Sequence, residues 1–171
     1  MAAKLQNNFE IPEERDVSFP PAHTAEHLLN QTMVRLFGCE RSNNAHIERK
    51  KSKISYILDH KPDRREERLI ESTMNELIEQ DMPVTFEFLT RSELEELVMN
   101  ADEDTPDAQI SLDRLPEDAS ETIRLVRIGD YDVCPCIGKH VRSTAQIGRF
   151  ELLGTNWDEL KKSFRVRFKI V

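Results

Sequence analysis

The stretch PPAHTAEHLLNQTMVRLFG, residues 20–38, predicts the element on which the rest of the fold depends. Apolar side chains recur in it at helical spacing and Gly38 is a typical C-terminal stop, so we expect a helix over about residues 23–37. The apolar positions are Leu28, Leu29, Met33, Leu36 and Phe37. His23 and His27 lie four residues apart near the start of this helix. Their rings therefore project from one face and can share a metal ion.

A second pair of metal-binding residue types lies far along the chain, in the segment CIGKHVRSTAQIG at 136–148. Cys136 and His140 are again four residues apart, and Pro135 and Gly138 place them on a turn rather than inside a helix or strand. The two pairs together supply three imidazoles and one thiolate, a set that suits tetrahedral zinc. The sequence therefore predicts one zinc ion, bound by His23, His27, Cys136 and His140.

Cys134 is a rival for the thiolate ligand, because side chains two residues apart on an extended segment share a side. We prefer Cys136, since its spacing to His140 matches that of the histidine pair, and we expect Cys134 to be a small buried side chain. Cys39 is expected in the core. Three cysteines are an odd number and do not indicate a disulfide framework.

HTAEH at 23–27 can also be read as the His-x-x-Glu-His motif of inverted zinc peptidases, with Glu26 as the general base. Such an enzyme needs a further acidic ligand, and the scheme has no place for Cys136 and His140, so this is the weaker hypothesis. Two interpretations of Glu26 remain open. It orients a water near the metal, or it is an ordinary solvated side chain of the helix.

Strand and helix signals alternate along the rest of the chain and predict an α+β domain with a mainly antiparallel sheet packed with helices. We expect a flexible lead-in over residues 1–19 and one domain over residues 20–171. On the strand at 84–89, Val84, Phe86 and Phe88 should form the buried face, and Ser92 should cap the next helix. The expected elements are two β segments within 45–58, helices over 63–81 and 92–99, and strands at 84–89, 122–128, 131–134, 147–153 and 164–171.

The composition suits a single globular domain. The chain has 171 residues, of which 38% are hydrophobic and 33% are charged, with a net charge of −8. That charge counts against broad affinity for nucleic acids, although lysine and arginine residues are concentrated at 49–53 and 161–169. No apolar run is long enough to span a bilayer and residues 1–16 lack the apolar core of a signal peptide, so we expect a cytoplasmic protein with no membrane partner.

HTAEHLL at 23–29 resembles the first motif of the editing domain of alanyl-tRNA synthetases and of its free-standing relatives, often called AlaX. CIGKHVRSTAQIG at 136–148 is similar to their second motif, and the order, the separation and the intervening elements agree over about residues 20–171. The resemblance implies an alanyl/threonyl-tRNA synthetase editing-domain-like fold, with zinc on the four residues named above. It also implies that the protein hydrolyses mischarged tRNA in trans, typically seryl- or glycyl-tRNA for alanine. The chain resembles the shortest free-standing class, which has no aminoacylation activity. Ile137 and Lys139 depart from the residues common in the second motif, so the substrate can differ.

Further site residues follow from this hypothesis. Glu26 and Thr24 are the candidate catalytic residues, and Thr24, Ser42, Asn44 and Lys139 are candidates for binding the substrate. For the run 42–44 we prefer the interpretation as an ordinary turn. Lys51, Lys53 and Arg142 are candidates for binding the acceptor end of the tRNA, or are simply solvated. Two other functions stay open: a zinc-binding module of the same fold without editing activity, and a metallohydrolase of a small-molecule ester or amide. The oligomeric state is not predicted.

Overall fold

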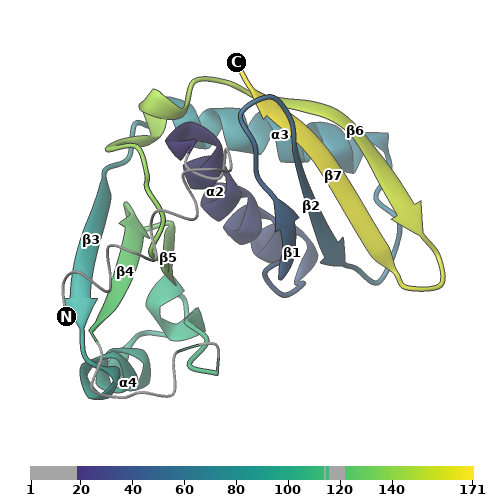
Figure 1. Ribbon diagram of the computed structural model, residues 1–171. Coiled ribbons are helices and arrows are strands. Elements are labelled where there is room, and N and C mark those ends of the chain that lie inside the picture. Colours follow the sequence, from purple (N-terminus) through teal and green to yellow (C-terminus); the bar gives the residue numbers. More distant parts are fainter. Residues whose placement is uncertain (1–18, 114, 116–121) are drawn as a thin grey trace.

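The computed structural model describes residues 19–113, 115 and 122–171, so the expected lead-in lies outside the described residues except for Phe19. Figure 1 shows how the helices and strands are arranged. The elements in chain order are α2 (Pro20–Phe37), β1 (Asn44–His46), β2 (Ser52–Ile57), α3 (Arg64–Glu79), β3 (Val84–Leu89), α4 (Arg91–Asn100), the short 3₁₀ turn η2 (Pro106–Gln109), β4 (Ile123–Ile128), β5 (Asp132–Pro135), the 3₁₀ turn η3 (Thr144–Ile147), β6 (Phe150–Asp158) and β7 (Ser163–Ile170).

Two separate antiparallel sheets carry the strands. The larger has the order β1-β2-β7-β6 and the smaller has the order β3-β4-β5. Helix α2 lies between the two sheets, α3 runs along the larger sheet and α4 lies at one end of the smaller sheet (Figure 1). This confirms the predicted α+β class, with the strands divided between two sheets. Within the described chain no helix combines the length and apolar character needed to cross a bilayer.

Most of helix α2 is buried, and from His27 to Met33 every residue is buried. It begins at Pro20, three residues before the expected start, because proline tolerates the first helical position, where an N–H would have no helical partner. Gly38 ends it in the left-handed conformation at φ 65°, and its N–H bonds to the Val34 carbonyl. Its buried residues are Ala22, Thr24, Ala25, His27, Leu28, Leu29, Asn30, Gln31, Thr32 and Met33. A helix buried on all sides over two turns is central to a core, so its buried polar residues need partners inside the protein.

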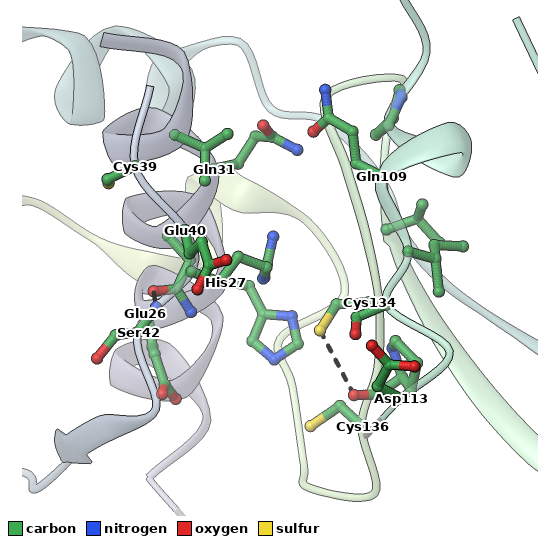
Figure 2. Close-up of a pocket in the computed structure, with 18 of the residues that line it drawn as sticks. Glu26, His27, Gln31, Cys39, Glu40, Ser42, Gln109, Asp113, Cys134 and Cys136 are labelled. Carbon is green, nitrogen blue, oxygen red and sulfur yellow. Dashed lines mark hydrogen bonds between the residues drawn. The ribbon is translucent and has the colours of Figure 1, made fainter. Parts of the chain in front are cut away.

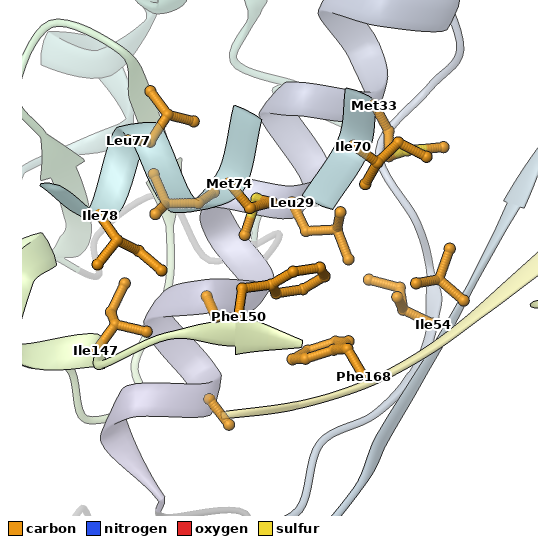
Figure 3. Close-up of a cluster of buried hydrophobic side chains, with 14 of the residues drawn as sticks. Leu29, Met33, Ile54, Ile70, Met74, Leu77, Ile78, Ile147, Phe150 and Phe168 are labelled. Atoms are coloured by element: carbon orange, nitrogen blue, oxygen red, sulfur yellow. The ribbon is translucent and has the colours of Figure 1, made fainter. Parts of the chain in front are cut away.

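The main core lies where α2, α3 and the larger sheet meet. Figure 3 shows Leu29 and Met33 of α2 facing Ile70 and Met74 of α3, with the Phe150 and Phe168 rings beneath them. The two rings stack with their centroids 5.0 Å apart. A second, smaller cluster fills the space between α4, η2 and the outer face of the smaller sheet, and consists of Leu94, Ile110, Leu115, Ile123, Leu125 and Val133. Each sheet therefore has an apolar layer of its own.

The buried face predicted for β3 is wrong in part. Val84 is buried, but the side chains of Phe86 and Phe88 are 44% and 66% exposed. Val84, Val126 and Ile128 join the main core, whereas Phe86 and Phe88 do not, so the apolar face of β3 extends beyond the part that the core covers. Alternation along a strand predicts which side chains share a face, but not how far a neighbouring element covers that face.

The cap predicted for α4 is wrong by two residues. Thr90, in extended conformation, is the N-cap, and its hydroxyl accepts a hydrogen bond from the Glu93 N–H at 3.2 Å. The Glu93 carboxylate accepts one from the Thr90 N–H at 2.9 Å, which completes a capping box. Ser92 lies inside the first turn and is exposed. Ser92 has a suitable side chain, but only Thr90 has the extended backbone that capping requires.

We predict that Thr90→Ala lowers the free energy of unfolding by about 1 kcal/mol, because the substitution leaves the Glu93 N–H without its partner. Ser92→Ala, on the exposed side of the same turn, should change it by less than about 0.5 kcal/mol. Urea unfolding of the two variants measures the difference, and equal losses in both would contradict the assignment of the cap.

Candidate metal centre

Four side chains from two distant segments converge at one point. His23 and His27 come from the first two turns of α2, and Cys136 and His140 from the loop that follows β5. One ligand atom from each lies within 4.8 Å of all the others. The His23 and His140 rings stack at a centroid distance of 4.2 Å, and His27 meets His140 edge-on at 4.5 Å. The four residues predicted from spacing therefore form one cluster that could hold a metal ion.

Hydrogen bonds on the outer ring nitrogens orient two of the imidazoles. His23 Nδ1 lies 3.1 Å from the Lys139 carbonyl, which can only accept, so this nitrogen carries the proton. His140 Nδ1 lies 2.9 Å from the Thr24 hydroxyl, which also accepts from the Val141 N–H at 3.2 Å. His140 Nε2 is buried and has no hydrogen-bond partner among the described residues. A buried ring nitrogen without a hydrogen-bond partner, on a ring that a second contact orients, fits a metal ion.

His27 is backed by a buried carboxylate. Asp132 Oδ2 lies 3.9 Å from His27 Nδ1, and Asp132 is fully buried. Arg41 donates to both oxygens of this carboxylate, at 2.6 and 3.3 Å, and Gln31 Nε2 donates to Oδ1 at 3.1 Å. These bonds offset the cost of burying the charge. Asp132 therefore contributes to the site as the residue behind a ligand, and not as a ligand.

Burial keeps the histidines in the form that binds metal. It lowers the pKa of His27 well below its ordinary value, and the neighbouring His140 lowers it further. Burial likewise lowers the pKa of His140 to about 3, with His23 and Arg124 adding to the effect. A neutral imidazole has the lone pair that coordination needs, so no proton has to leave these rings before a metal binds at neutral pH.

Arg124 of β4 holds the loop that carries the second pair. Its Nε donates to the Cys136 carbonyl at 2.7 Å, and a terminal nitrogen donates to the Gly138 carbonyl. The Cys136 N–H bonds in turn to the Arg124 carbonyl at 3.1 Å, which continues the pairing of β4 and β5 by one residue. Cys136 Sγ then lies 3.5 Å from His23 Nε2. The loop is therefore fixed at two carbonyls on either side of Ile137.

Cys134 and Cys39, the other thiols, lie outside the cluster. Cys134 Sγ lies 3.5 Å from the Pro135 carbonyl and burial raises its pKa to about 11. Cys39 packs at the edge of the main core, and burial also raises its pKa. Burial raises the pKa of Cys136 too, but the Gly138 N–H, 3.4 Å from its sulfur, acts in the opposite direction. Of the two candidate thiols, only Cys136 is in reach of the three histidines.

The close approach of the His23 ring to the backbone requires glycine at position 138. A Cβ at this position would lie 2.1 Å from Cε1 and 2.6 Å from Nδ1 of His23, well inside contact distance. The ring of His23 occupies the space that any other residue would fill. The glycine between Cys136 and His140 therefore allows the two motifs to meet.

A pocket of about 650 Å³ opens beside the metal-binding cluster. It lies between α2, the segment 39–42, residues 106–115 and β5, and Figure 2 shows Glu26, His27 and Gln31 on one wall facing Cys134, Cys136 and Asp113 on the other. Three carboxylates line it, those of Glu26, Glu40 and Asp113, whereas the guanidinium of Arg41 is bonded to Asp132. The pocket therefore favours a ligand with a positively charged group.

Glu26 lies close to the cluster. Its Oε1 is 3.7 Å from His23 Nε2, and its side chain lines the pocket. Burial raises the pKa of Glu26, and the nearby His23 and Arg41 lower it. This position beside the cluster favours the interpretation that Glu26 orients a water near the metal over that of a solvated side chain.

The other predicted residues lie in several places. Thr24 is fully buried, and its hydroxyl contacts His140 and Val141 rather than the pocket. Ser42 lines the pocket, and its hydroxyl donates to the Ser55 carbonyl at 2.6 Å. Asn44 is exposed at the start of β1 and is not among the residues that line the pocket. Lys139 has an exposed side chain, and its carbonyl holds His23.

The basic candidates lie on the surface. Lys51 and Lys53 are exposed, on the turn between β1 and β2 and on β2 itself, and Arg142 is exposed in the loop after His140. In the same turn, the Arg49 guanidinium lies over the Phe19 ring at 4.4 Å. Because Phe19 immediately precedes α2, this turn lies at the end of the helix that carries His23.

Sequence reasoning missed Asp132, Arg41 and Arg124. All three act through other residues, across contacts between positions far apart in the chain. No local sequence pattern distinguishes Asp132, Arg41 or Arg124 from ordinary charged surface residues. The pairing of β4 with β5 brings Arg124 to the loop of Cys136, and the segment after α2 brings Arg41 to Asp132.

Comparison with known proteins relates the chain to translation enzymes. Residues 123–165 match the family model of the threonyl and alanyl tRNA synthetase second additional domain. The alanyl-tRNA editing protein AlaX-L of Pyrococcus horikoshii is 34% identical over 104 residues, 53% of this chain and 25% of that protein. The alanine–tRNA ligase of Hyperthermus butylicus is 32% identical over 151 residues, 87% of this chain and 15% of that protein. The threonine–tRNA ligase of Staphylococcus aureus is 30% identical over 134 residues, 78% of this chain and 20% of that protein. The chain thus spans a quarter or less of the length of these relatives.

We predict that Gly138→Ala lowers the affinity for a divalent metal ion by at least about tenfold, because the added methyl group displaces the His23 ring. Ile137→Ala, one residue away with a side chain that is 78% exposed, should leave the affinity unchanged. Titration with cobalt(II), whose absorption reports thiolate ligation, measures both variants. Equal affinity in Gly138→Ala and the parent would show that His23 is not a ligand.

Proposed function

We propose that this chain hydrolyses the ester of mischarged tRNA, with seryl- or glycyl-tRNA for alanine as the substrates, because residues 123–165 match the threonyl and alanyl tRNA synthetase second additional domain and part of the chain is similar to an alanyl-tRNA editing protein. The observation that supports this most directly is the convergence of the two motifs: ligand atoms from His23, His27, Cys136 and His140 lie within 4.8 Å of one another. The pocket beside them is large enough for an aminoacyl group.

Zinc is the proposed metal. Three imidazoles and one thiolate are the donors it prefers, and the buried His140 Nε2, which has no hydrogen-bond partner within the described part of the chain, supports a metal in this position. When bound, zinc can polarise a carbonyl oxygen or lower the pKa of a water. Hydrogen bonds from behind would keep two of the rings in place, His23 through the Lys139 carbonyl and His140 through Thr24, and Asp132 lies 3.9 Å from His27.

The pocket suggests how the aminoacyl group binds. An aminoacyl ester carries a free α-ammonium group, which the carboxylates of Glu26, Glu40 and Asp113 would attract. Glu26 lies closest to the ligands, with Oε1 3.7 Å from His23 Nε2, and is placed to accept a proton at Oε1 from an attacking water. The basic candidates Lys51, Lys53 and Arg142 lie outside the pocket, where the phosphates of the acceptor end would pass.

A second function shares the same chemistry. The acidic pocket also suits a metallohydrolase of a small cationic ester or amide, since nothing in the pocket itself requires a nucleic acid. The salt dependence of KM distinguishes the two proposed functions. Because phosphate contacts release counterions, KM for aminoacyl-tRNA should rise steeply with salt. A small-molecule ester should show little dependence.

The main test is deacylation. We expect the purified zinc-loaded protein to release serine from seryl-tRNA for alanine faster than alanine from alanyl-tRNA. His140→Ala should reduce the release by at least about 10²-fold, because it removes a ligand. His46→Ala, which changes an exposed histidine on β1, is the matched control and should retain full activity. A protein that binds zinc and releases neither amino acid would be a zinc module without editing activity.

Thr24 gives a sharper test of roles. Its contacts predict that it positions His140, so Thr24→Val should lower zinc affinity about 10- to 100-fold while Thr24→Ser retains it. At saturating zinc the ratio of seryl- to alanyl-tRNA hydrolysis should be unchanged in Thr24→Val. A changed ratio with unchanged zinc affinity would instead make Thr24 a residue that reads the substrate.

A further inference from the structure

One face of the smaller sheet carries both the metal ligand Cys136 and the exposed phenylalanines of β3. Residues directly opposite in antiparallel strands share a face, and Phe86 pairs with Val126, which pairs with Cys134. Two residues along each strand, Phe88 pairs with Arg124, and the Cys136 N–H bonds to the Arg124 carbonyl. Phe88, Arg124 and Cys136 therefore form one row across the sheet.

The phenylalanines lie next to the metal-binding cluster. The ring centroid of Phe86 is 6.4 Å from that of His140, and the guanidinium of Arg124 lies over the Phe86 ring at 4.6 Å. Phe86 and Phe88 are 44% and 66% exposed, and Ile137 of the metal-binding loop is 78% exposed. Two large aromatic side chains on one exposed strand face, beside a candidate active site, indicate a surface that a ligand covers.

Three basic residues lie on or near this face. Arg124 lies within it, and the metal-binding loop contributes the exposed side chains of Lys139 and Arg142. The loop runs beside β3, because the Val84 N–H bonds to the Arg142 carbonyl at 2.8 Å. The acidic residue of β3, Glu87, points to the opposite face, where it pairs with Arg127. Exposed aromatic rings with basic groups around them suit an unpaired, negatively charged strand.

We propose that Phe86 and Phe88 form a stacking platform for unpaired nucleobases at the 3′ end of the RNA that presents the ester to the metal-binding cluster. The proposal rests on the function proposed above, which supplies the RNA, and it adds the residues that bind the bases. The aminoacyl group would occupy the pocket on the β5 side of Cys136, and the bases would lie on the β3 side, across Arg124. Stacking tolerates any base, which suits a single-stranded end.

The platform complements an overall charge that disfavours nucleic acids. With a net charge of −8, the chain cannot rely on a broad basic surface to hold RNA. Stacking depends little on charge, and each base stacked on an aromatic ring adds about tenfold or more in affinity. A strand face with two rings and a few basic groups can therefore bind a short overhang selectively, without attracting duplex RNA in general.

The test uses the full zinc-loaded chain and an uncharged RNA hairpin with a four-nucleotide 3′ overhang that contains 2-aminopurine, whose fluorescence falls on stacking. We expect binding with quenching for the overhang hairpin and much weaker binding for the blunt hairpin. Phe88→Leu should weaken overhang binding about tenfold, Phe86→Leu/Phe88→Leu more, and Phe88→Trp should retain it. Ile57→Ala, a 65% exposed apolar position on β2, is the matched control and should bind as the parent does.

The proposal is overturned if Phe88→Leu and the double variant bind the overhang as tightly as the parent, or if the blunt hairpin binds equally well. It is also overturned if sedimentation shows a dimer that Phe88→Leu dissociates, since a second copy of the chain would then cover the face. The probe carries no ester, so it tests stacking even in a protein that fails to deacylate. Conversely, if the protein deacylates tRNA but the phenylalanine variants bind the overhang as the parent does, the stacking platform is wrong and the proposed function stands. In an active enzyme, Phe88→Leu should raise KM for aminoacyl-tRNA and leave kcat and zinc content unchanged.

Discussion

The burial of the middle of helix α2 between two sheets is the constraint on which the rest of the structure depends. A buried helix still contains polar side chains, and each of them needs a partner inside the protein. Asn30 Oδ1 accepts from the Tyr56 hydroxyl at 2.9 Å, Gln31 donates to Asp132, and the Thr24 hydroxyl contacts His140. These bonds connect the helix to β2, β5 and the metal-binding loop. The polar residues of α2 therefore fix how both sheets pack on it.

The metal-binding cluster and the core are consequently parts of one packing arrangement. Asp132 shows this most clearly, because it is fully buried, binds Arg41 and Gln31, and backs His27. An unpaired carboxylate in this position would cost several kcal/mol, so the ion pair with Arg41 is required by the fold whether or not a metal is bound. The same contacts fix Asp132 beside His27, one of the four residues of the candidate metal-binding cluster.

The sequence predicts the parts that rest on local pattern. Helical periodicity, Gly38 and the shared spacing of the two pairs were sufficient to locate α2 and the four residues of the cluster. Three features required the tertiary structure. The cap of α4 depends on the backbone conformation at Thr90, the exposure of Phe86 and Phe88 depends on how far the core extends over β3, and Asp132 depends on strand register. Sequence patterns show which residue types are present, but not which neighbour covers them.

The tight turn from β4 to β5 sets the register of the strand that ends in Cys136. Gly129 takes φ 50° there, and Tyr131 N–H bonds to the Ile128 carbonyl. Side chains alternate along a strand, so one residue more or less in this turn would move both Asp132 and Cys136 to the opposite face of the sheet. A single-codon insertion or deletion at Gly129–Tyr131 would therefore abolish the metal-binding cluster and expose the buried ion pair together. Homologous genes should keep the length of this turn constant even where its residues vary.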